Sequence, residues 1–289
     1  MLVKIGGLRF MKNMNRAMVV LACSVSFLCG CSSQVAKKGD QSVTELYQRN
    51  VLALSWMQNA AEYRALCYQA YNGAYDHIKS SLKQKTDKPR AIILDLDETV
   101  IDNIAAEATI NAVAKDGKEF NDNWLAWESM ASANAMPGAA EFLNKVDKLG
   151  VQIFYVSNRS CMNVDFTNKN LKSLKFPMKN TVKCKDNTSN KKARFDKILE
   201  KYNVVAFLGD NATDFPISIY GVSGLDRNKI VDKISIQFGV KYFVLPNPVY
   251  GEWYSQIDPN LLKQSKKKMV ELLDKSVKTD SFLKKAISK

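Results

Sequence analysis

The sequence predicts an α/β protein in which a parallel sheet is flanked by helices, with a smaller helical part beside it. Short apolar runs alternate with longer stretches of helical periodicity, an arrangement typical of β-α-β units. Three of these runs end abruptly in polar residues, and parallel strands place their carboxyl ends at one edge of a sheet. With 289 residues, 46% of them hydrophobic, the chain can build a sizeable core.

The N-terminus has the features of an export signal. A basic leader precedes an apolar run over residues 17–30, which is short for a membrane span. The run ends at Leu28-Cys-Gly-Cys31, which resembles the bacterial lipobox. This resemblance implies that residues 1–30 are removed, that Cys31 bears acyl chains such as palmitate, and that residues 31–42 form a tether. Ser32 resembles the outer-membrane sorting pattern, and an ordinary signal peptide cut nearby is the alternative.

Charge and cysteine content narrow the functional classes. The net charge of +13 falls to +9 without the leader, which has four basic residues and no acid. Nucleic acid, anionic lipid and anionic substrates compete as explanations, and export argues against nucleic acid. Only Cys67, Cys161 and Cys184 follow Cys31, so the cysteines form no disulfide framework. One disulfide between two of these three cysteines is possible, and the sequence does not favour any particular pair.

The first half of the chain alternates helix, strand and helix. Helical periodicity covers residues 43–85, and the apolar run 91–94 indicates a buried strand. Residues 101–115 are again helical in pattern. An aromatic-rich stretch follows, so residues from about 103 to 136 resemble an insertion. We expect one domain, 43–289, whose smaller helical part combines residues 43–88 with this insertion.

The second half continues the alternation. Helices are expected at 139–149, 164–174 and 193–202, and strands at 151–156, 204–208 and 241–245. A lysine-rich tail closes the chain, and its pattern indicates a solvated helix.

Polar residues follow the predicted strands and should meet at one edge of the sheet. They are Asp95, Asp97, Ser157, Asn158, Asp210 and Asp214, with Lys191 on a nearby loop. An isolated Asp-x-Asp could be a solvated turn, but three strands ending this way indicate a functional edge. Carboxylates held this close repel one another without a cation or proton between them, and their hard oxygens suit Mg²⁺. Zn²⁺ is disfavoured because His77 is the only histidine.

Several catalytic classes are excluded by what the chain lacks. A single histidine argues against phosphohistidine chemistry and against a Ser-His-Asp triad. No cysteine has an arginine six residues later, as cysteine phosphatases require, and there is no Walker A pattern. A carboxylate nucleophile remains.

Four motifs in order resemble those of the haloacid dehalogenase (HAD) superfamily. They are Asp95-Leu-Asp97-Glu98-Thr99, Ser157-Asn158-Arg159, Lys191, and Gly209-Asp210-Asn211 with Asp214. More narrowly, residues 31–260 resemble the class C acid phosphatases, the 5′-nucleotidase lipoprotein e(P4) family. The narrower similarity rests on Leu-Asp-Glu-Thr, Lys191-x-x-Arg194 and the segment Leu245 to Trp253.

The resemblance implies a role for each motif residue. Asp95 would attack phosphorus to form an aspartyl-phosphate, and Asp97 would act first as acid and then as base. Ser157, Asn158 and Lys191 would bind the phosphoryl oxygens, with Lys192 as a rival to Lys191. Mg²⁺ would be held by Asp95, the backbone carbonyl of Asp97, and Asp210. Asp214 and Asn211 would lie nearby, as further ligands or as residues that orient the ligands.

The implied substrates are phosphomonoesters, nucleoside 5′-monophosphates prominent among them. A base needs flat aromatic faces, and Phe120, Trp124, Tyr250 and Tyr71 are the candidates, Phe120 and Tyr250 first. The sequence thus indicates a lipid-anchored, Mg²⁺-dependent acid phosphatase of the bacterial cell envelope, at the outer membrane, with no nucleic-acid partner; a homodimer is left open. The alternatives are a broad phosphomonoesterase without nucleotide preference and a lipoprotein of the same fold that binds haem or a nucleotide.

Overall fold

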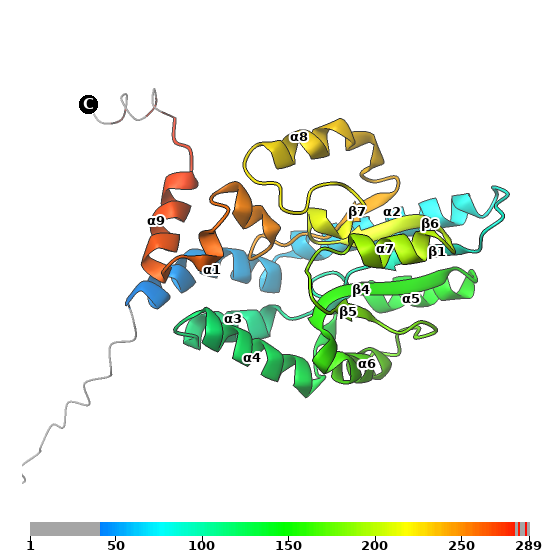
Figure 1. The fold of residues 1–289 in the computed structure, drawn as a ribbon, viewed down its shortest axis with the longest axis horizontal. Coiled ribbons are helices and arrows are strands. Elements are labelled where there is room, and N and C mark those ends of the chain that lie inside the picture. The colour runs from blue at the N-terminus through cyan, green and yellow to red at the C-terminus, as the bar shows by residue number, and fades with distance from the viewer. Residues whose placement is uncertain (1–40, 281–282, 284–286, 288–289) are drawn as a thin grey trace, which may run out of the picture. The chain divides into compact units, whose positions relative to one another are not determined.

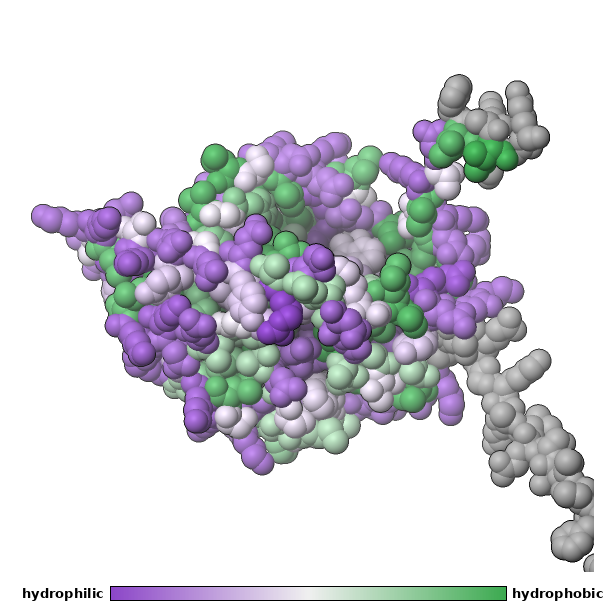
Figure 2. Space-filling view, turned by 180° about the vertical axis from the view of Figure 1, so that it is seen from behind, coloured by the Kyte–Doolittle hydropathy of each residue, from purple (hydrophilic) through white to green (hydrophobic). Residues whose placement is uncertain are grey.

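The computed structural model describes residues 41–280 together with 283 and 287 (Figure 1). The expected signal peptide, Cys31 and the tether up to residue 40 lie outside the described residues. Within the described part, no helix is long and apolar enough to cross a membrane. Hydrophilic side chains are spread over the face drawn in Figure 2, with hydrophobic ones in smaller groups between them.

A five-stranded parallel sheet forms the centre, in the order β5-β4-β1-β6-β7. The strands are β1 (Arg90–Leu94), β4 (Gln152–Ser160), β5 (Lys183–Lys185), β6 (Asn203–Gly209) and β7 (Tyr242–Val244). Leu94 pairs with Tyr155 of β4 and with Leu208 of β6, so β1 and β6 end at nearly the same level, while β4 continues to Ser160. The residues that follow β1 and β6 therefore meet at one edge, as the sequence predicts.

Helices cover both faces of the sheet. On one face, Ile92 and Leu94 pack in a core with residues of α2 (Ala61–Ser81), α5 (Ala139–Lys148) and α6 (Val164–Ser173). On the other face, Ala91 and Ile93 pack with Phe195 of α7 (Lys192–Leu199). Successive strand residues point to opposite faces, which is why β1 is apolar throughout rather than alternating. The helix α8 (Asp226–Lys233) follows β6.

A helical part lies beside the sheet (Figure 1). It contains α1 (Gln41–Asn59), α3 (Ile104–Val113), α4 (Gly117–Met130) and α9 (Lys266–Ser276), with α1 packed on α3 and α9. The periodic stretch 43–85 is two helices, because Ala60 has an extended backbone with ψ 132°. The break sends α1 to the helical part and leaves α2 against the sheet.

Three further details differ from the sequence analysis. Residues 101–102 are not helical: they form β2 (Ile101–Asp102), which pairs with β3 (Asn134–Ala135) at the two ends of the insertion. The strand β5 was not predicted, because it has only three residues, Lys-Cys-Lys, at the sheet edge. The helix α9 is not simply solvated, since Met269 and Val270 are buried in a cluster with Leu46.

A disulfide joins Cys161, just after β4, to Cys184 in β5, while Cys67 is a buried free thiol. The sequence left this pairing undecided, because β5 itself was not recognised.

Candidate active site

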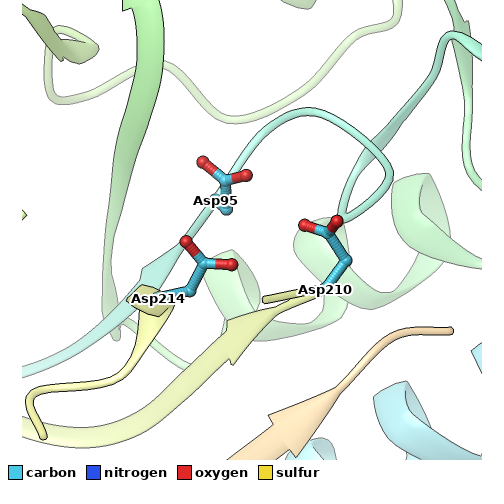
Figure 3. A group of neighbouring side chains, drawn as sticks. All are labelled: Asp95, Asp210 and Asp214. Atoms are coloured by element: carbon cyan, nitrogen blue, oxygen red, sulfur yellow. The ribbon is translucent and has the colours of Figure 1, made fainter. Parts of the chain in front are cut away.

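Three carboxylates converge at the carboxyl edge of the sheet. Asp95 follows β1, Asp210 follows β6, and Asp214 ends a 3₁₀ turn at Ala212–Asp214. Figure 3 shows the three carboxyl groups turned toward a common space. One oxygen from each lies within 4.8 Å of the others, so the group could hold a metal ion. Asp210 and Asp214 are only four positions apart, and the parallel pairing of β1 with β6 brings Asp95, which is 115 positions before Asp210, next to them.

A buried lysine is shared by two of these carboxylates. Lys191 precedes α7 and its side chain is only 2% exposed. Its Nζ donates to Asp95 Oδ1 and, at 2.7 Å, to Asp214 Oδ1. Lys192, the rival in the sequence, is instead exposed and paired with Asp196 on its own helix. Lys191 is therefore the lysine that the structure brings to the carboxylate group.

The electrostatic balance of the group is negative. Three ionised carboxylates against one ammonium leave two negative charges in a buried space. Burial raises the pKa of Asp95 to about 7; Lys191 opposes this rise, and Asp214 and Asp97 add to it. Burial, with repulsion from Asp214 and Asp95, also raises the pKa of Asp210 well above its usual range. A hard divalent cation would relieve this repulsion, and the all-carboxylate donor set suits one.

Lys191 keeps its charge within the group. Burial alone lowers the pKa of Lys191, but the attraction of Asp214 and Asp95 outweighs this, so the pKa is raised. Removing either carboxylate would leave a buried ammonium with half of its compensation.

The turn after β6 fixes Asp214. A Cβ added at Gly209 would lie 2.2 Å from the Cβ of Asp214, so only glycine fits there. Asp214 Oδ2 accepts the backbone N–H of Asn211 at 2.9 Å, and its Oδ1 accepts from Lys191. Both oxygens of Asp214 are thus engaged. The Asn211 side chain accepts from Thr213 and so caps its own turn rather than reaching toward Asp95.

Asp210 is held by two residues to which the sequence analysis gave no role. Thr99 Oγ1 donates to Asp210 Oδ1 at 3.2 Å, and Asn247 Nδ2 donates to Asp210 Oδ2 at 2.9 Å. Asn247 follows β7, so the rule that selected the other strand ends could have found it.

Asp97 is anchored through one oxygen. Its Oδ1 accepts from Asn103 Nδ2 at 2.9 Å and from Arg159 Nε at 2.9 Å, with Arg159 Nη2 at 2.8 Å. Arg159 is 3% exposed; its burial lowers its pKa, Asp97 raises it, and the net effect is a raised pKa. No described residue donates to Oδ2, so the anchoring of Asp97 is one-sided.

Ser157 and Asn158 lie within β4, which continues to Ser160, rather than after the strand. Ser157 is fully buried, and its Oγ accepts the backbone N–H of Arg159 at 3.0 Å. Arg194 donates to Asn158 Oδ1 at 2.7 Å and to the carbonyl of Ser157 at 2.6 Å. Of the two cations in the Lys191-x-x-Arg194 motif, Lys191 therefore contacts the carboxylates and Arg194 contacts β4.

Glu98 stabilises the turn that follows Asp97. It is fully buried and has a φ of 50°, a backbone conformation that costs free energy for a residue other than glycine. Its Oε1 accepts the backbone N–H of Asn103 at 2.7 Å, and its Oε2 accepts from the hydroxyl of Tyr250. Burial raises the pKa of Glu98 well above its usual range, with Asp97 and Asp210 adding to the rise.

The four aromatic candidates fall in different surroundings. Tyr71 is 2% exposed, stacks on Phe142 with ring centroids 5.1 Å apart, and donates to the carbonyl of Thr99. It is a core residue with no open ring face for a substrate, so the expectation for Tyr71 is not supported. Its helical spacing from Cys67, Ala74 and Ile78, all buried, already indicated this.

Phe120 and Trp124 are partly exposed and stack on each other along α4, with centroids 6.4 Å apart. Tyr250 is partly buried, and its hydroxyl is hydrogen-bonded to Glu98. Trp127, also on α4, donates from Nε1 to Asn103 Oδ1 at 2.8 Å, which connects α4 to the residues around Asp97.

Comparison with known proteins adds the family. Residues 21–253 match the model of the HAD superfamily, subfamily IIIB (acid phosphatase). The structure is similar to that of the class C acid phosphatase from Bacillus anthracis, with a TM-score of 0.78 and 33% identity over 82% of this chain and 100% of that one. The structure of the same enzyme with tungstate bound gives a TM-score of 0.77 at the same identity and coverage. The chain therefore belongs to the subfamily IIIB acid phosphatases of the HAD superfamily, which are phosphomonoester hydrolases of the class C fold.

Proposed function

We propose that the chain is a lipid-anchored, Mg²⁺-dependent acid phosphatase that hydrolyses nucleoside 5′-monophosphates through an aspartyl-phosphate. One observation supports this most strongly. Asp95 follows β1 and lies beside the buried Lys191, in a group of three carboxylates with that one ammonium. A nucleophile, a cation for the phosphoryl oxygens and a place for a divalent metal are thereby adjacent.

Asp95, the nucleophile, and Asp97, the acid, each have one carboxylate oxygen that is available for the reaction. Lys191 contacts Asp95 Oδ1, which leaves Oδ2 to form a bond to phosphorus while the bond to the leaving oxygen breaks. Asp97 Oδ2, which no described residue occupies, would give its proton to that leaving oxygen. Asp97 would then take a proton from the water that attacks phosphorus in the aspartyl-phosphate. The bond from phosphorus to Asp95 Oδ2 breaks and phosphate leaves, so Asp95 is again a carboxylate and Asp97 again a carboxylic acid.

The residues present fit a magnesium ion. Asp95, Asp210 and the backbone carbonyl of Asp97 would hold it, while Thr99 and Asn247 orient Asp210. When bound, Mg²⁺ supplies positive charge to the phosphoryl oxygens. Lys191 would add a second positive charge beside Asp95, and Arg194 holds the strand that carries Ser157 and Asn158.

For the leaving group, the aromatic side chains of α4 and Tyr250 support a nucleoside. Phe120 and Trp124 offer partly exposed rings, and stacking of a base on an aromatic ring contributes about 1–3 kcal/mol. The Bacillus anthracis enzyme was solved with tungstate, an oxyanion, which is consistent with an oxyanion site in this fold. A broad phosphomonoesterase is the second candidate, favoured by the mutual stacking of Phe120 and Trp124, which occupies one ring face of each. A pure binding lipoprotein has no use for Lys191 buried between two carboxylates.

Export from the cytoplasm is supported by the disulfide. The protein contains the disulfide Cys161–Cys184, and disulfides persist in oxidising compartments outside the cytoplasm. With the lipobox at Cys31, this favours a lipid anchor in the cell envelope, at the outer membrane.

Asp95→Asn is expected to lower kcat for phosphate release by about 10³-fold or more, because an amide is not a nucleophile. Asp147→Asn is the matched control, since Asp147 pairs with Lys179 on the surface. Full activity in Asp95→Asn would refute the mechanism. In the same assay, a higher kcat/KM for AMP than for glucose 6-phosphate supports the nucleotide preference, and equal values support the broad esterase.

Arg159→Gln is expected to lower kcat by about 10–100-fold with a small effect on KM, because Asp97 loses two of the three contacts to Oδ1. Arg159→Lys should restore part of the lost kcat, and Arg64→Gln on the surface of α2 should leave kcat unchanged. A kcat of Arg159→Gln equal to that of the wild type, or a loss confined to KM, would remove Arg159 from this positioning role.

The metal-free protein is expected to lose stability between pH 4 and pH 8. The pKa of Asp95 is about 7 in the folded protein, against an ordinary aspartate pKa of 3.8, so this group stabilises the fold at low pH and the contribution is lost as the pH rises through 7. Burial also raises the pKa of Glu107 to about 7, so Glu107 changes the stability in the same direction. The contribution is on the order of 1.4 kcal/mol per pKa unit.

Calorimetric unfolding with and without Mg²⁺ measures this effect. Mg²⁺ should raise Tm more at pH 8 than at pH 5, because it binds the ionised carboxylates. An equal rise in Tm at both pH values would contradict the assignment of the three carboxylates to the metal.

Cys31→Ser is expected to abolish incorporation of radiolabelled palmitate into the protein in cells and to release the protein from the membrane fraction. Cys23→Ser, within the signal peptide, is the control. Palmitate labelling that persists in Cys31→Ser would rule out this anchor.

A further inference from the structure

A small cavity lies beside the residues that follow β6. It has a volume of about 110 Å³, and Asp210, Asn211, Ile219, Arg227, Trp253 and Gln256 are among the residues that line it. Neither Thr99 nor Asn247, the residues that hold the Asp210 carboxylate, lines the cavity. The Asp210 oxygens are thus occupied by residues outside it. The cavity is therefore distinct from the space between the three carboxylates.

Arg227 brings a buried cation to this cavity without a counter-ion. Its side chain, from α8, is 2% exposed, and its one hydrogen bond to a described residue is a long contact of 3.4 Å from Nη1 to the carbonyl of Ile219. Its Nε is buried with no partner. Burial lowers the pKa of Arg227, and Glu252, which is not within ion-pair distance, only partly opposes this.

Arg159 provides the internal comparison. It is buried to the same degree, at 3% exposed, but is bonded to a carboxylate, an amide oxygen and a hydroxyl. The buried guanidinium of Arg159 is therefore compensated by side chains of the protein itself. Arg227 has no such partner among the described residues, and an unpaired buried charge is costly.

A second residue that lines this cavity also has an unsatisfied donor. Trp253 Nε1 is buried without a partner among the described residues, although the indole N–H of a buried tryptophan normally finds one. Two of the lining residues, one of them charged, thus each carry an unsatisfied donor. Water could fill the cavity, but water would leave the charge of Arg227 without a counter-ion.

We propose that this cavity binds a small oxyanion, with the Arg227 guanidinium and Trp253 Nε1 as its donors. The planar N–H groups of a guanidinium match two oxygens of a phosphate or a carboxylate. The oxyanion is either free phosphate or the carboxylate of a small acid, since both present that pair of oxygens. The proposal does not depend on the catalytic roles assigned to Asp95 and Asp97.

Calorimetric titration of the Mg²⁺-loaded protein with inorganic phosphate, at constant ionic strength, tests the proposal. The wild type is expected to bind one more phosphate per chain than Arg227→Gln. Trp253→Phe keeps the ring and loses one hydrogen bond to a charged group, so it should weaken this site about tenfold. Arg64→Gln, a surface arginine, should leave the stoichiometry and the affinity unchanged.

A parallel titration with acetate identifies the source of the oxyanion. Competition of acetate with phosphate at the Arg227-dependent site indicates a carboxylate ligand, and its absence indicates phosphate. If wild type, Arg227→Gln and Trp253→Phe bind both ions alike, the cavity holds only water and the proposal is wrong. Should Arg227→Gln fail to fold, the affinity of Trp253→Phe decides.

Discussion

The ion pairs of Lys191 with Asp95 and Asp214 are the interaction on which the candidate site depends. They place one ammonium between two carboxylates in a largely buried space, where a charge without a partner is costly. Because a third carboxylate, Asp210, lies beside them, the ammonium cannot neutralise the group. The remaining negative charge is what makes the site suitable for a divalent cation, and the position of Asp95 is what makes it suitable for attack on phosphorus.

The fold supplies the geometry for these ion pairs. Parallel pairing of β1 with β6 sets Asp95 next to Asp210, and the close approach at Gly209 lets Asp214 fold back over the end of β6. Lys191 lies at the start of α7, directly before the first residue of that helix. Around this centre a second set of contacts, from Arg159 and Asn103, holds Asp97 by one oxygen. The two aspartates of one short turn thus have different partners, which is consistent with different roles.

Much of this arrangement could be predicted from the sequence. The apolar runs of β1 and β6 each stop at a polar residue, so the meeting of Asp95 with Asp210 follows from parallel topology. The choice of Lys191 over Lys192 followed from the spacing to Arg194. These are properties of local pattern and chain order, which the sequence displays directly.

What could not be predicted depends on contacts between distant segments. The pair Arg159–Asp97 joins residues 62 positions apart, and only the packing of β4 against β1 shows it. The division of the first helical stretch at Ala60 has no proline or glycine to mark it. The burial of Tyr71, in contrast, was visible in its spacing from Cys67 and Ile78, and was missed because its ring suggested a ligand contact.

The most direct test of the central claim is a count of the metal ions that the site binds. Titration of the metal-free protein with Mg²⁺ at neutral pH should show one ion per chain, and Asp210→Asn should weaken its binding by about 100-fold, because one of the carboxylate ligands is removed. Phosphate release should disappear with the bound ion. Unchanged Mg²⁺ affinity in Asp210→Asn, or full phosphatase activity in a protein stripped of metal, would contradict this account of the site.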